Sequence, residues 1–94
     1  MLSVLQAARH AGRRPTHCFA VLAEADPGIM PRMMALFAKR GLLPDYWCSR
    51  LSDGELAVDL QVMGMERDTA AYIAACFRQM PGVRTVLTSE KSRV

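Results

Sequence analysis

The arrangement of apolar residues along the chain predicts four β-strands. In the segment 56–62, every second residue is leucine or valine, which is typical of a strand with one buried face. An apolar run at 17–24 predicts a central strand, and the segments 43–51 and 83–88 predict two more. Pro44 cannot donate a hydrogen bond to a neighbouring strand, so we expect the 43–51 strand at an edge of the sheet.

Two helices are predicted between these strands. The first should begin at 26–28, because Asp26 can cap free N–H groups and proline at the first helical position loses no helical bond. It should end at Gly41. The second should run from about 66 to 79 and end at Pro81-Gly82. The apolar residues at helical spacing are Ile29, Met33, Leu36, Phe37 in the first helix and Ala70, Ile73, Ala74, Phe77 in the second.

The elements follow the order β-α-β-β-α-β, with a tight turn at Asp53-Gly54 between the second and third strands. Right-handed crossovers then predict an α+β fold: an antiparallel four-stranded sheet in the order 4-1-3-2, with both helices on one face. The second strand lies at an edge and carries Tyr46, Trp47 and Cys48. Its unpaired main-chain groups favour pairing with a second copy, which predicts a side-by-side homodimer with one continuous sheet.

The net charge of +3 is located entirely in the first fourteen residues. Arg9, Arg13 and Arg14 lie there without any acidic residue, and the other basic residues equal the nine acidic ones in number. This distribution indicates no nucleic-acid-binding face. The segment resembles an organellar transit peptide, but we favour a flexible N-terminal arm over residues 1–15. Residues 91–94 are expected to form a solvated C-terminal tail.

The residue types that serve catalysis and metal binding are sparse. The three cysteines form no C-x-x-C pair and are interpreted as buried, reduced thiols, so neither a metal site nor a cofactor is expected. No nucleophile is arranged around His10 or His17, which indicates a protein that is not an enzyme. No apolar run is long enough to span a bilayer, and we expect a cytoplasmic protein without a membrane partner.

A candidate binding site remains where the first strand leads into the first helix. The N–H groups of Gly28, Ile29 and Met30 have no partner within the helix, and such helix ends attract carboxylates. Gly28 would let a ligand approach the backbone closely. A well-capped helix without a ligand explains the same residues equally well.

The sequence ADPGIMPRMMALFAKRGLLPDYW, residues 25–47, resembles the ACT domain, and in particular the small regulatory subunit of acetolactate (acetohydroxyacid) synthase. The resemblance extends over residues 17–90. The segment 35–41 is similar to the family's helix-ending phrase G-L-F-x-R-R-G, and the segment 81–86 is similar to P-G-V-x-x-V. The resemblance implies a ferredoxin-like βαββαβ sandwich, the ACT domain, over residues 16–90.

The resemblance also implies a binding site and a function. An amino-acid effector would lie between the first loop of one subunit and the second strand of its neighbour, and the positions that carry over are Asp26, Gly28, Ile29, Met30, Leu43, Pro44 and Asp45. The chain would then be a non-catalytic regulatory subunit of a branched-chain amino-acid biosynthetic enzyme, with a catalytic synthase chain as partner. A free-standing amino-acid-sensing homodimer and a structural dimer without ligand remain as alternatives.

Overall fold

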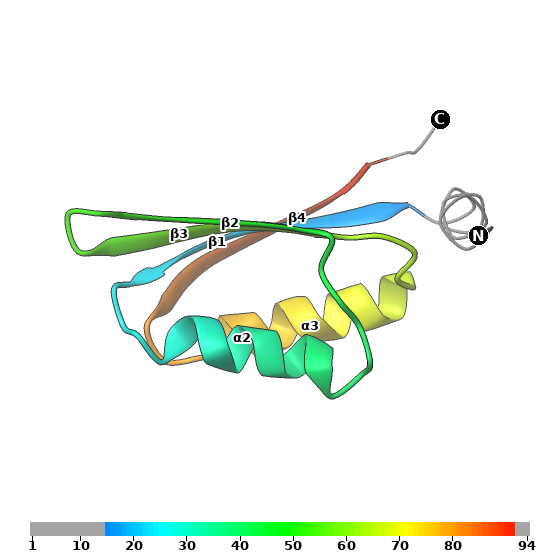
Figure 1. The fold of residues 1–94 in the computed structure, drawn as a ribbon, viewed down its shortest axis with the longest axis horizontal. Coiled ribbons are helices and arrows are strands. Elements are labelled where there is room, and N and C mark those ends of the chain that lie inside the picture. Colours follow the sequence, from blue (N-terminus) through cyan, green and yellow to red (C-terminus); the bar gives the residue numbers. More distant parts are fainter. Residues whose placement is uncertain (1–14, 92–94) are drawn as a thin grey trace, which may run out of the picture.

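The computed structural model describes residues 15–91, which form one sheet covered on one face by two helices (Figure 1). The predicted β-α-β-β-α-β order is confirmed. The elements in chain order are β1 Thr16–Glu24, α2 Ile29–Ala38, β2 Tyr46–Ser52, β3 Glu55–Val62, α3 Arg67–Gln79 and β4 Val83–Lys91. Within the described residues, no helix is long and apolar enough to cross a membrane, and no three metal-ligating side chains are grouped together.

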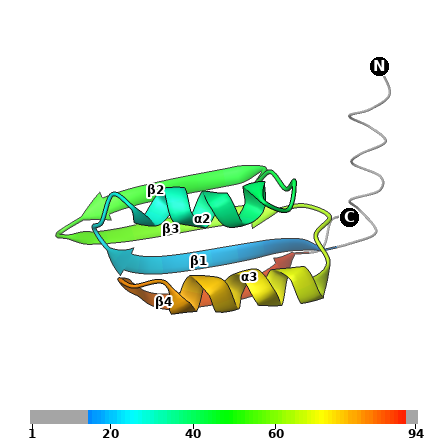
Figure 2. The ribbon, with the colours of Figure 1, turned by 90° about the horizontal axis from the view of Figure 1, so that it is seen from below.

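The sheet has the strand order β2-β3-β1-β4, as predicted, and every neighbouring pair is antiparallel. The pairing brings Val21 of β1 opposite Val58 of β3 on one side and Val86 of β4 on the other. Helix α2 lies over β2 and β3, and α3 lies over β1 and β4 (Figure 2). Strands β2 and β4 are therefore the two edges of the sheet.

The core lies between the sheet and the two helices. Three aromatic rings meet at its centre: Phe19 from β1, Phe37 from α2 and Phe77 from α3, each at most 1% exposed. Their centroids lie 5.6 to 6.2 Å apart in edge-to-face geometry, which is the arrangement that aromatic quadrupoles prefer. The alternation predicted for β3 is confirmed, because all four of its leucine and valine residues are at most 5% exposed.

Helix α2 begins later than predicted. Its first residue is Ile29, and Pro27 lies in the turn before it. The Asp26 carboxylate accepts a hydrogen bond from the Gly28 N–H at 2.9 Å, and the Asp26 carbonyl accepts one from the Ile29 N–H at 3.1 Å. These two bonds close a separate turn, so helical geometry starts only after it.

Strand β2 also begins later, at Tyr46 rather than at residue 43. Leu43, which is 86% exposed, and Pro44 belong to the connection that follows α2. The connection ends at Asp45, whose N–H donates to the Gln61 carbonyl at 3.0 Å and whose carboxylate accepts the Met63 N–H at 2.9 Å. Asp45 thus fixes the point at which pairing with β3 begins.

Strand β4 is longer than the predicted 83–88 segment and continues to Lys91, which lies opposite Thr16 of β1. The Glu90 carboxylate near its end pairs with the Arg67 guanidinium at 2.6 Å, so this position belongs to the sheet and not to a tail. Most of the predicted arm, 1–14, and of the predicted tail, 92–94, lies outside the described residues.

Candidate functional site

The loop between β1 and α2 is held at both sides by main-chain hydrogen bonds. The Glu24 N–H donates to the Gly82 carbonyl at 2.8 Å, and the Ala25 N–H donates to the Gly54 carbonyl at 3.1 Å. Gly82 precedes β4, and Gly54 lies in the turn between β2 and β3, so the loop is fixed against two neighbouring turns. Both glycines have positive φ, +90° and +76°, a conformation that favours glycine.

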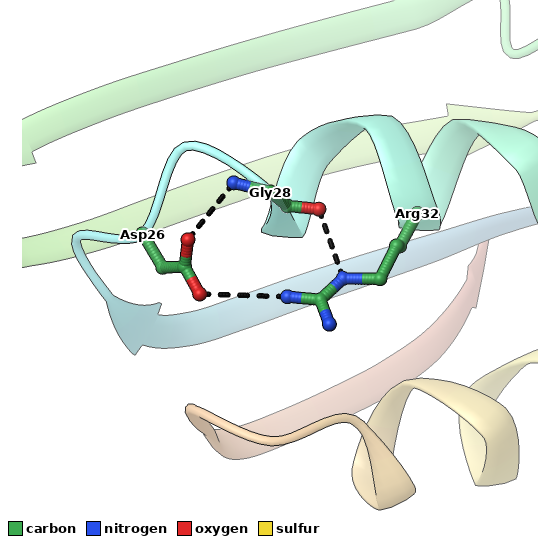
Figure 3. A network of polar contacts seen from close by, with 3 residues as sticks. All are labelled: Asp26, Gly28 and Arg32. Atoms are coloured by element: carbon green, nitrogen blue, oxygen red, sulfur yellow. Dashed lines mark hydrogen bonds and ion pairs between the residues drawn. The ribbon is translucent and has the colours of Figure 1, made fainter.

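Three residues of this loop and of the first turn of α2 form a closed polar network (Figure 3). The Asp26 carboxylate accepts from the Gly28 N–H at 2.9 Å and lies 3.4 Å from the Arg32 guanidinium. The Arg32 Nε donates to the Gly28 carbonyl at 2.9 Å. The Asp26 and Arg32 side chains are half-exposed, so the network braces the loop while both charged groups still contact solvent.

This network changes the expected chemistry of the loop. The Asp26 carboxylate already occupies the position on the Gly28 N–H where a ligand carboxylate was expected. Gly28 has φ −82° and ψ −11°, which any residue adopts. A Cβ atom at this position would lie 3.4 Å from the Arg32 Nη2 and 3.5 Å from the Asp26 Oδ1. A side chain at position 28 would therefore press on the network rather than strain the backbone.

A cavity of about 290 Å³ lies between this loop and the edge strand β2. Asp26 and Met30 are the predicted site residues that line it, whereas Ile29 is fully buried in the core. The remaining lining residues come from the loop and from the β2–β3 hairpin: Ala25, Pro27, Ser49, Arg50, Leu51 and Leu56. Met30, Leu51 and Leu56 give it an apolar wall, and Asp26 and Arg50 supply one negative and one positive charge.

The other predicted site residues lie far from this cavity within one chain. Leu43, Pro44 and Asp45 follow the C-terminal end of α2, whereas Asp26 and Gly28 precede its N-terminal end (Figure 2). A ten-residue helix is about 15 Å long. One chain alone therefore does not bring the two predicted groups together.

The residues predicted at the dimer edge alternate between the two faces of β2. Tyr46 and Cys48 lie opposite Gln61 and Asp59 on the open face of the sheet, and Trp47 packs against the core. A hydrogen bond with the Cys48 side chain raises the pKa of Tyr46. Cys48, like the other two cysteines, is a free thiol, but all three are half-buried rather than buried.

Sequence reasoning missed the residues that complete the site. Arg32 was assigned to the solvent face of the helix, yet its spacing of four from Gly28 and six from Asp26 places it over the loop, and that spacing was available as a signal. Ser49, Arg50 and Leu51 line the cavity only because β2 passes beside the start of α2. No local pattern in the sequence encodes that neighbourhood.

Comparison with known proteins identifies the fold. The family model described as ACT-like domain matches residues 11–93. The ACT domain of the GTP pyrophosphokinase of Chlorobium tepidum superposes with a TM-score of 0.68 at 16% identity, covering 79% of this chain and 96% of that one. A search of the curated proteins found no match.

Two further solved structures share the fold at low identity. The C-terminal domain of the MgtC protein from Mycobacterium tuberculosis has a TM-score of 0.65 at 13% identity and covers 83% of this chain and 88% of that one. A homoserine dehydrogenase from Thiobacillus denitrificans has a TM-score of 0.72 at 12% identity, with 88% of this chain but only 19% of that one covered. The fold therefore occurs both as a separate unit and as a small part of a larger enzyme chain.

Proposed function

Because the chain belongs to the ACT-like domain family, a type of regulatory ligand-binding module, we propose that it binds a small amino acid at the interface of a homodimer. The observation that supports this function is the cavity of about 290 Å³ beside β2, whose lining includes three residues of that edge strand. A second copy paired along β2 would lie directly beside the cavity. The site would then be completed by dimerisation.

The direction of the strands indicates which part of the partner would reach the cavity. Strands β1 and β2 are both antiparallel to β3, so both end at the side of the sheet where α2 begins. If two copies of β2 pair antiparallel about a two-fold axis near Ser49, the start of one lies beside the end of the other. The partner's residues 43–45 would then approach Asp26 and Met30, which unites the two groups of predicted site residues.

The charges around the cavity suit an amino acid. The Asp26 carboxylate can accept a hydrogen bond from the ligand's ammonium group, and Arg50 is the cationic residue in the lining. The Arg50 side chain is 74% exposed and its only described ion pair is a 4.0 Å contact with Asp59, so reorienting it costs little. Met30, Leu51 and Leu56 would contact an aliphatic side chain of the ligand.

The finer proposal is a regulatory subunit of an acetolactate-synthase-type enzyme that acts on branched-chain amino-acid biosynthesis in the cytoplasm. Its support is the resemblance of residues 25–47 and 81–86 to that subunit. In this role the chain has no catalytic activity of its own and acts through a catalytic synthase chain. A free-standing amino-acid sensor would use the same cavity without such a partner.

Calorimetry with valine, leucine and isoleucine tests the site. The Asp26→Asn variant keeps an oxygen that can accept from the Gly28 N–H but removes the negative charge, so we expect binding at least about tenfold weaker in a protein that still folds. Asp53→Asn is the matched control, because it removes a charge from the nearby β2–β3 turn without touching the cavity lining, and it should bind as the parent does.

A second variant, Gly28→Asp, tests the network. Its φ of −82° is compatible with aspartate, so the variant should stay folded. The new carboxylate would lie beside Asp26 and Arg32 and disturb both, and amino-acid binding should be lost. Equal binding by Gly28→Asp and the parent would place the amino acid elsewhere. A dimer that binds none of the three amino acids would favour the structural alternative, and stimulation of a synthase catalytic chain would then separate a partner subunit from an inert dimer.

A further inference from the structure

A second cavity lies at the opposite end of the sheet from the site proposed above. Its volume is about 350 Å³, and it lies where β1 begins, β4 ends and α3 begins. Phe19, Ala70 and Ala71 form an apolar wall, and His17, Arg67 and Glu90 supply polar groups. His17 and Glu24 lie near the two ends of β1, about 23 Å apart along an extended strand, so the two cavities cannot share a ligand.

The imidazole of His17 is the unusual group in this cavity. The residue is only 6% exposed, and its Nε2 is buried without a hydrogen-bond partner among the described residues. A buried ring nitrogen without a partner is uncommon in folded proteins and generally indicates a bound water, ion or ligand. A cavity of about 350 Å³ is roughly ten times the volume that one water molecule occupies in the liquid.

Arg67 and Glu90 form the charged rim of the same cavity. The Arg67 Nε and Nη2 donate to the two carboxylate oxygens of Glu90 at 2.6 and 3.2 Å. A guanidinium carries five N–H groups in a planar fork, so three of them lie outside this pair. The Arg67 side chain is 77% exposed. A second carboxylate can therefore approach the far edge of the guanidinium without displacing Glu90.

We propose that this cavity binds a small organic carboxylate with a short aliphatic body, independently of the amino-acid site. The ligand carboxylate contacts the Arg67 guanidinium and the His17 imidazole. The aliphatic body packs against Phe19, Ala70 and Ala71. Helix α3 contributes in the same direction, since it starts at Arg67 and no side chain caps its N-terminus, and a helix N-terminus favours a nearby negative charge.

Isobutyrate is the probe, and isobutyramide is its neutral counterpart of the same shape. NMR spectra of the full chain should show saturable shifts of the His17 ring and of the amides around Arg67 and Ala71 with isobutyrate, with a dissociation constant of about millimolar, as expected for so small a ligand. Isobutyramide should bind at least about tenfold more weakly, because it lacks the charge. Equal shifts from both compounds, or no saturable shift from either, would overturn the proposal in favour of bound water only.

Substitutions on α3 locate the site. Ala71→Met fills the cavity from an exposed helix position and should abolish isobutyrate binding. Ala75→Met adds the same side chain one turn later, outside the lining, and should bind as the parent does. Arg67→Gln should weaken binding at least about tenfold. His17→Phe keeps the shape of the buried ring and should also weaken it. If Ala71→Met binds isobutyrate as tightly as Ala75→Met, the cavity is not the site.

The Asp26→Asn variant separates this inference from the proposed function. It lies at the other end of β1 and should bind isobutyrate as the parent does, whatever its effect on amino-acid binding. Loss of isobutyrate binding in Asp26→Asn would show that the carboxylate occupies the β1–α2 loop, and the second site would then be rejected.

Discussion

The two edges of the sheet differ in how their main-chain groups are protected. Strand β2 has seven residues, and Arg50 is its only charged side chain. Strand β4 has nine residues and includes Arg84, Glu90 and Lys91. The Arg78 side chain of α3 donates to the Val86 carbonyl of β4 at 2.9 Å. Charged side chains and a covering helix are ways in which proteins prevent unwanted strand pairing.

The difference indicates which edge meets a second copy. On β2, the apolar side chains of Leu51 and Tyr46 are 68% and 48% exposed, and the described residues place no side chain from a helix on its main chain. On β4, the pairs Arg84–Glu55 and Arg67–Glu90 add charge along the strand. We therefore expect dimerisation through β2 and not through β4, and the following predictions test this asymmetry from the largest expected effect to the smallest.

A lysine in the middle of β2 should prevent dimerisation. In antiparallel pairing of two copies, the two introduced side chains of Ser49→Lys would lie near each other at the two-fold axis, and like charges brought together across an interface cost several kcal/mol. The dimer dissociation constant should rise by about 100-fold or more. Light scattering should then report 10.4 kDa for the variant and about twice that mass for the parent.

The matched control is Thr85→Lys on β4, which is also an exposed strand position. It should leave the dimer intact. A parent protein that is a strict monomer at about 50 μM, or a dimer broken by Thr85→Lys and not by Ser49→Lys, would assign the interface to another surface.

Removing the helix-to-strand hydrogen bond should weaken β4 measurably. Arg78→Met keeps an aliphatic stem but leaves the Val86 carbonyl without its guanidinium donor, and a hydrogen bond to a charged group contributes about 1.5 kcal/mol or somewhat more. Urea unfolding should show a loss of about that size in the free energy of unfolding. Arg78→Lys, which retains a donor, should lose less. Equal losses in both variants would mean that the charge, and not the hydrogen bond, is what matters.

The smallest effect is expected at the end of β4. The hydrogen bond from Arg67 lowers the pKa of Glu90, so the folded protein favours the ionised carboxylate. The stabilisation by this pair is present above the normal glutamate pKa of about 4.3 and is lost as the pH falls through the lowered pKa. The difference in melting temperature between the parent and Glu90→Gln should therefore be small at neutral pH and disappear in acid. A difference that persists at low pH would show that glutamine disturbs β4 by another route.

Most of the fold could be predicted from the sequence because its signals are local. Alternation defines β3, and the positive φ of Asp53 and Gly54 corresponds to the predicted turn. The strand order followed from the handedness of the crossovers. The errors occurred where a tertiary contact decides an element's end: Asp45 delays the start of β2 through Met63 and Gln61, and pairing of Lys91 with Thr16 prolongs β4.

The candidate sites were less predictable for the same reason. The loop at Asp26 and Gly28 was found from its local pattern, but the role of Arg32 depends on a side-chain orientation that the sequence does not give. The cavity beside Ser49 and Leu51 exists because two distant segments lie next to each other. The pair between Arg67 and Glu90 joins residues 23 positions apart, and no pattern links them.

The pairing of β1 with β4 has a consequence for how the protein is made. β1 lies inside the sheet between β3 and β4, yet β4 is the last described strand to be synthesised. On the ribosome, β1, α2, β2 and β3 emerge while one side of β1 still lacks its partner, and Phe19 and Val21 remain incompletely covered. Such non-local pairing slows folding and leaves apolar surface exposed to aggregation. Fast translation of the segment after α3, or a chaperone that covers β1, should therefore raise the yield of folded chain.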